Sequence, residues 1–104
     1  MRRNRYDQND TENRGDGMRD VYGVAAFRSR QQVLRFEAML KAQGVPARVV
    51  TTPRDISMGC GLSVRFPMEY LQDVRRALRR LNSGNLIGLY RAEYDGMRLR
   101  VTPV

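Results

Sequence analysis

The chain has 104 residues, 41% of them hydrophobic, and a formal net charge of +8 at pH 7. This length predicts one domain, and the lack of a long apolar run leads us to expect neither a membrane-spanning helix nor a secretory signal. The absence of histidine excludes Ser-His and Cys-His catalysis and most zinc sites.

The cysteine content and the charge narrow the class of protein further. Cys60 is the only cysteine, which excludes an internal disulfide. A lone thiol suits a reducing compartment, so we expect a cytoplasmic protein. We expect no metal site and no cofactor. The basic excess favours a nucleic-acid partner, but an arginine-rich composition is equally typical of a GC-rich genome.

The composition divides the chain into three parts. Residues 1–19 are polar and almost free of aliphatic side chains, so they predict a disordered N-terminal tail. Residues 20–91 carry the periodic apolar patterns of a folded domain. Residues 92–104 are expected to form a C-terminal extension, made of a hairpin turn and an edge strand.

The first predicted elements are a strand, a helix and a second strand. Residues 21–27 form a short apolar run with β-branched and aromatic members, which is typical of a buried strand. Ser29 offers an N-cap oxygen with Gln32 at capping-box spacing, and the helix is predicted to end near Ala42. A second strand follows at residues 45–51. The buried stripe of the helix is predicted to consist of Val33, Phe36, Met39 and Leu40.

The second half repeats this pattern and adds a strand. Residues 62–66 alternate between apolar and polar side chains, as a half-buried strand does. A helix is predicted over residues 67–81, opened by a proline in its first turn. A fourth strand is predicted at residues 86–90. Residues 94–97 contain an Asp-Gly pair typical of a hairpin turn, which leads to a fifth, edge strand at 97–101.

The order of these elements predicts an α+β fold. A β-α-β-β-α-β succession is typical of a ferredoxin-like sandwich, with two helices on one face of an antiparallel sheet. The apolar first and third strands would lie inside the sheet, and the C-terminal strand would be added to it. The connection between the second and third strands has about ten residues, which is long for a hairpin and indicates a functional loop.

Cys60 lies at the end of this long connection. Gly59 and Gly61 remove side-chain bulk on both sides of the thiol and permit positive φ, so that backbone N–H groups can converge on the sulfur. Arg54 and Arg65 are near in sequence and add positive potential. Both effects would favour the thiolate, which is the reactive form of cysteine. The alternative is a small, buried cysteine without reactivity.

The residues around Cys60 resemble a known family. The resemblance rests on three segments: Thr52-Pro53-Arg54-Asp55-Ile56-Ser57, Cys60-Gly61-Leu62 and Val64-Arg65-Phe66. They are similar to the signature of the selenium/sulfur carrier-like family of short bacterial domains. The resemblance implies that the sulfur of Cys60 is the carrier atom and that Thr52, Pro53 and Arg54 belong to the site. Met58 stands where a small residue is usual in that family.

The leading hypothesis is therefore a carrier that holds sulfur or selenium as a persulfide-type adduct on Cys60. We expect an accessory protein rather than a stand-alone enzyme, with donor and acceptor enzymes as partners and no membrane. The expected substrate-binding residues are Thr52, Pro53, Arg54, Gly59, Gly61 and Arg65.

Two non-enzymatic alternatives remain open. The first is an RNA-binding module, because sandwiches of this kind stack bases on aromatic residues of the sheet. Its candidate residues are Tyr22, Phe27 and Phe66 on the strands and Arg75, Arg76, Arg79 and Arg80 on the second helix. The second alternative is a protein-interaction module that forms a homodimer through its edge strand.

Overall fold

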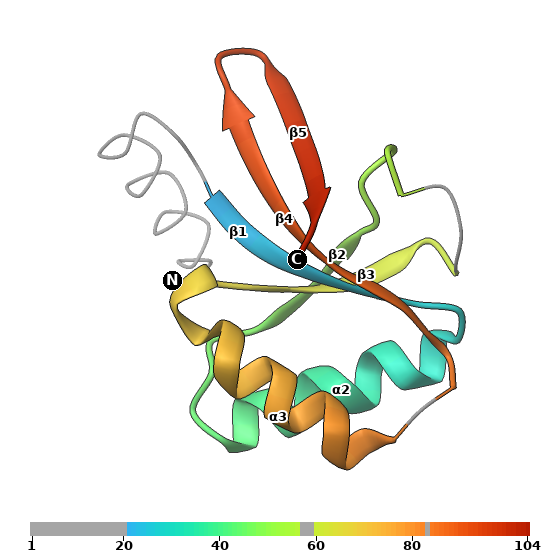
Figure 1. Ribbon diagram of the computed structural model, residues 1–104. Coiled ribbons are helices and arrows are strands. Elements are labelled where there is room, and N and C mark those ends of the chain that lie inside the picture. The colour runs from blue at the N-terminus through green and yellow to red at the C-terminus, as the bar shows by residue number, and fades with distance from the viewer. Residues whose placement is uncertain (1–20, 57–59, 83) are drawn as a thin grey trace, which may run out of the picture.

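The computed structural model describes residues 21–56, 60–82 and 84–104, so the tail predicted for residues 1–19 lies outside it. All strands of the described residues belong to one antiparallel sheet with the order β2-β3-β1-β4-β5 (Figure 1). The elements are β1 (Val21–Phe27), α2 (Arg30–Ala42), β2 (Arg48–Thr51), β3 (Leu62–Phe66), the 3₁₀-helix η1 (Met68–Tyr70), α3 (Leu71–Leu81), β4 (Leu86–Asp95) and β5 (Arg98–Pro103).

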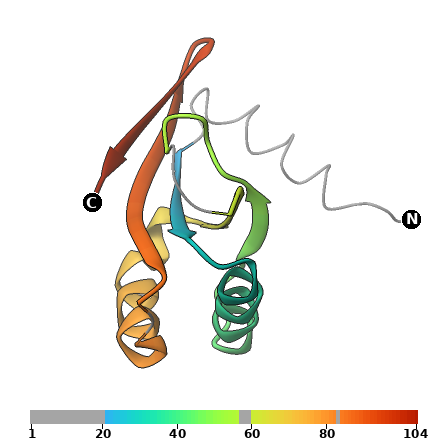
Figure 2. The ribbon, with the colours of Figure 1, turned by 90° about the vertical axis from the view of Figure 1, so that its right-hand side faces the viewer.

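The α+β class is confirmed, and the two helices cover one face of the sheet (Figure 2). The first and third strands lie inside the sheet as predicted, and β1 is hydrogen-bonded on both sides. Ala25 of β1 is paired with Val64 of β3 and with Leu89 of β4. The rest of the sheet is therefore assembled around β1.

Residues Tyr22 to Phe27 of β1 are buried on both faces of the sheet. Ala25 and Phe27 join the core under the helices, while Val24 and Ala26 join a second apolar cluster on the helix-free face. A strand buried on both faces needs no polar alternation, which explains its continuous apolar sequence. It also means that both faces of β1 must be covered by other parts of the chain.

The first helix, α2, begins and buries its side chains as its sequence predicts. The hydroxyl of Ser29 accepts a hydrogen bond from the N–H of Gln32 at 3.4 Å, which is an N-cap. The buried Oε1 of Gln32 finds no partner among the described residues, so the second hydrogen bond of a capping box is not formed. The helix directs Val33, Phe36 and Leu40 into the core, with Met39 at its margin.

The helix predicted at residues 67–81 is divided in two. Its first turn is the 3₁₀-helix η1, in which the N–H of Tyr70 bonds the carbonyl of Pro67 at 3.0 Å. The α-helical part, α3, buries Val74 and Ala77. Asn82 ends it in a left-handed conformation with φ of 47°, a role that asparagine tolerates better than most residues.

The second strand is shorter than predicted. The prediction began at residue 45, but β2 begins at Arg48. The N–H of Ala47 bonds the carbonyl of Val45 at 2.8 Å, which makes a tight three-residue turn before the strand. Val45 and Ala47 are nevertheless buried against the helices, so their apolar character reflects core packing rather than strand pairing.

The C-terminal hairpin is confirmed, but its strands are longer than predicted and its turn lies one residue later than the predicted residues 94–97. The fourth strand was predicted to end at residue 90, but β4 continues to Asp95, through the boundary expected between domain and extension. Asp95 pairs with Arg98, so Gly96 and Met97 form a two-residue loop. Gly96 has φ of +73°, at the position where a type II′ turn carries glycine.

We predict that Gly23→Ala destabilises the fold. A Cβ built on Gly23 would lie 2.2 Å from the ring of Phe66, which is buried in the core. Overpacking of this kind costs about 1–3 kcal/mol of unfolding free energy, measurable by chemical denaturation. Gly84→Ala is the control, because a Cβ there meets nothing within 4 Å. Equal stability of the two variants would contradict the predicted close packing.

Candidate functional site

Cys60 lies where the long connection meets the third strand, two residues before β3. Its N–H donates to the carbonyl oxygen of Phe27 at 3.2 Å, and its Sγ donates a weak hydrogen bond to the carbonyl of Leu62 at 3.6 Å. The side chain is half-buried and packs against the core under the helices. Phe27 is the last residue of β1, so the thiol lies at the end of the sheet where β1 leads into α2.

The position after Cys60 requires glycine because of its backbone conformation. Gly61 has φ of +90° and is exposed, and a Cβ placed on it would meet nothing within 4 Å. Only the left-handed backbone, and not a lack of space, therefore restricts this position to glycine. Gly59 and Met58 lie outside the described residues, so the proposed nest of N–H groups around the sulfur stays a prediction.

Thr52 closes the base of the long connection. Its N–H donates to the carbonyl of Gly61 at 2.9 Å, and its hydroxyl lies 2.7 Å from the hydroxyl of Ser63. Ser63 is completely buried, so this contact satisfies a polar group that has lost its water. The structure thus brings Thr52 beside the backbone that follows Cys60, and gives it a structural role there.

Pro53 and Arg54 belong to a turn that follows Thr52. The carbonyl of Pro53 accepts a hydrogen bond from the N–H of Ile56 at 3.0 Å, which closes the turn. Arg54 is exposed in the middle of this turn. Its guanidinium is therefore available to an anionic group that approaches the loop from solvent.

Ile56 anchors the connection to the helix-free face of the sheet, a role that the sequence pattern does not predict. The side chain is only 8% exposed and lies in the second apolar cluster. Its buried companions there are Tyr22, Val24, Ala26 and Ala92, with Ile87, Tyr90, Leu99 and Val101 around them. The available signal was an isolated β-branched residue within a polar loop.

Arg65 is the expected site residue that the structure does not bring to the thiol. Its guanidinium carbon lies 3.8 Å from the centroid of the Tyr22 ring, a cation–π contact. Tyr22 belongs to the helix-free cluster, whereas Cys60 packs on the helix side. Arg65 therefore stabilises the face opposite the thiol in this conformation.

The described surroundings of Cys60 are apolar on the side of the core. The next residue in the sequence, Gly61, is exposed to solvent. Within residues 21–56, 60–82 and 84–104, no group of three His, Cys, Asp or Glu side chains is placed to hold a metal ion. Two of the aromatic residues considered for base stacking, Phe27 and Phe66, are buried in the core.

Comparison with known proteins agrees with the resemblance seen in the sequence. A family model described as "Putative Se/S carrier protein-like" matches residues 22–86. The match covers more than half of the chain, and the protein belongs to this family. No curated protein and no solved structure matches the chain. In the part of the chain that the structure describes, every helix is too short or too polar to span a membrane.

We predict that Thr52 and Ser63 are energetically coupled. Thr52→Val leaves the buried hydroxyl of Ser63 without this partner, which costs about 1–2 kcal/mol of unfolding free energy. Ser63→Ala should cost a similar amount, and the double variant should lose clearly less than the two single losses together. Chemical denaturation of all four proteins measures this cycle. Strict additivity would show that the two hydroxyls do not stabilise each other.

Proposed function

We propose that the protein carries sulfur or selenium as a persulfide-type adduct on Cys60. The observation that carries the proposal is the position of the chain's only cysteine. Cys60 is half-buried at a loop–strand junction, inside the region that matches the carrier-like family. Partial burial is compatible with a carrier, because the sulfur remains reachable while the core limits access of water.

The transfer needs no second reactive group on this chain. The Cys60 thiolate would attack the outer sulfur of a donor persulfide, so that a new S–S bond forms as the donor S–S bond breaks. The donor leaves as a thiolate, and the outer sulfur stays on Cys60. An acceptor nucleophile then attacks that sulfur, and Cys60 leaves as the thiolate. A selenium cargo would follow the same course, with selenium as the outer atom.

In this proposal, residues of the connection hold the anionic outer atom. Gly59 and Gly61 would let backbone N–H groups approach it, and the exposed Arg54 would supply a positive charge. Thr52 and Pro53 would shape the loop through the hydrogen bonds at its base and in its turn. Arg65 would take part only if its guanidinium left the Tyr22 ring.

The remaining expectations belong to the same proposal. We assign β1 to β4 and the two helices to the ferredoxin-like arrangement, which the strand order supports. Loading and unloading would require a donor and an acceptor enzyme. A lone thiol stays reduced in the cytoplasm, which we propose as the location. Binding of RNA is the less favoured function, because the described sheet buries Phe27 and Phe66.

We predict that the protein acquires the mass of one sulfur atom when incubated with a persulfide donor such as glutathione persulfide. Intact-mass spectrometry measures the adduct, and a reductant should remove it. Cys60→Ser is the control and should stay unmodified, because it lacks the only thiol. The carrier function fails if the wild type takes up no sulfur while its thiol still reacts with iodoacetamide.

We also predict that Arg54→Ala slows sulfur loading by about 1.4- to fivefold. An exposed charge contributes roughly 0.2–1 kcal/mol to an ionic contact, which sets this range. The rate of adduct formation is followed by mass spectrometry at low ionic strength. Arg79→Ala on α3 is the matched control, since Arg79 is also exposed but lies on a helix. Equal rates for both variants would remove Arg54 from the proposed site.

A further inference from the structure

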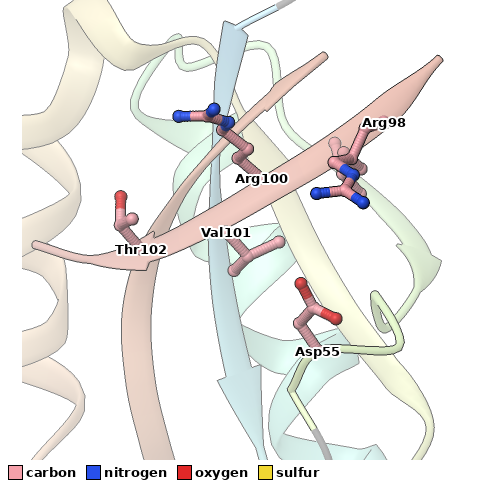
Figure 3. Close-up of a pocket in the computed structure, with 6 residues that line it drawn as sticks. Asp55, Arg98, Arg100, Val101 and Thr102 are labelled. Carbon is pink, nitrogen blue, oxygen red and sulfur yellow. The ribbon is translucent and has the colours of Figure 1, made fainter. Parts of the chain in front are cut away.

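A groove runs between β5 and the connection that carries Cys60. It has a volume of about 540 Å³ and is lined by Asp55 of the connection and by Arg98, Leu99, Arg100, Val101 and Thr102 of β5 (Figure 3). Successive side chains of a strand point to opposite faces, so a groove on one face would meet only alternate residues. Five consecutive residues therefore indicate a groove along the outer edge of β5.

The backbone of this edge is oriented to pair with another strand. β5 is the last strand of the sheet order, and its described neighbour is β4. The N–H of Val104 bonds the carbonyl of Leu89 at 3.0 Å. Paired residues of an antiparallel ladder alternate between bonded and non-bonded positions, so Leu99 and Val101 direct their N–H and C=O groups away from β4. These groups face the groove.

The charges along the edge favour an acidic partner. Arg98 and Arg100 are exposed, and Arg98 forms no ion pair with any residue that the structure describes. Among the described residues, the ion pair of Arg100 is a long contact of 3.7 Å with the exposed Asp95. Pairing two copies of β5 in registers centred on Leu99 or Arg100 would place arginines of both copies opposite each other, which is unfavourable. A register centred on Val101, which places Arg100 opposite Thr102, would let two copies of β5 pair without this repulsion.

We propose that this groove binds an extended acidic segment of a partner protein as a sixth strand beside β5. The backbone of the segment would pair with Leu99 and Val101, and its carboxylates would face Arg98 and Arg100. Asp55 on the opposite wall of the groove repels carboxylates. The acidic side chains of the segment would therefore lie on the side of Arg98 and Arg100. The proposal does not depend on the chemistry of Cys60, but it brings a partner to the connection that carries the thiol.

The probe for this proposal is a fluorescein-labelled peptide of alternating glutamate and valine, and the matched peptide contains lysine in place of glutamate. Fluorescence anisotropy at low ionic strength should show saturable binding of the acidic peptide to the full chain and none of the basic one. Arg98→Glu with Arg100→Glu should weaken binding about tenfold. Arg79→Glu with Arg80→Glu, on exposed positions of α3, is the control with the same charge change and should have little effect.

Amide hydrogen exchange locates the added strand. Peptide binding should slow exchange at the amides of Leu99 and Val101, whereas a peptide N-methylated on the groups that face β5 should not bind. The proposal is overturned if the acidic peptide does not bind. It is also overturned if the two double variants, on β5 and on α3, weaken peptide binding equally. It is also overturned if light scattering shows a dimer with these amides already protected. The proposal is likewise overturned if a single-stranded oligonucleotide displaces the peptide with the same dependence on Arg98 and Arg100. The groove would then be a nucleic-acid-binding surface.

Discussion

The burial of β1 on both of its faces is the constraint that organises the molecule. This strand is hydrogen-bonded on both sides and apolar above and below the sheet. Both α-helices of the described residues lie on one face of the sheet (Figure 2). The other face must therefore be covered by other parts of the chain. The second face is covered by Ile56 of the long connection, with Leu99 and Val101 of β5 around it. The connection and the C-terminal hairpin thus satisfy one shared packing requirement.

This requirement explains the position of the thiol. The connection is attached at one point to the helix-free face through Ile56 and at another to the end of β1 through the N–H of Cys60. Thr52 closes its base against Gly61. The cysteine backbone is consequently held by the sheet, while its sulfur remains at the margin of the core. A half-buried thiol on a fixed backbone is the feature that links the fold to the proposed carrier chemistry.

Much of the fold could be predicted because local patterns and tertiary packing agree. The strands at 21–27 and 62–66 and the helix N-cap at Ser29 follow from periodicity and capping chemistry. Predictions failed where an apolar residue is buried without belonging to a strand, as Val45 is. The face of Arg65 follows from strand alternation, but the sequence could not show that the thiol lies on the other side. The role of Ile56 depends on contacts with β4 and β5, which are distant in sequence.

The end of the family match at Leu86 has a further consequence for the integrity of the sheet. Leu86 is the first residue of β4, so nearly all of β4 and the whole of β5 lie beyond the matched region. A polypeptide ending there would turn β1 into an open edge, with unpaired backbone groups flanked by apolar side chains on both faces. Such edges are templates for aggregation. The folded sheet of this protein therefore extends past the matched region, because β4 is the strand that closes this side of β1.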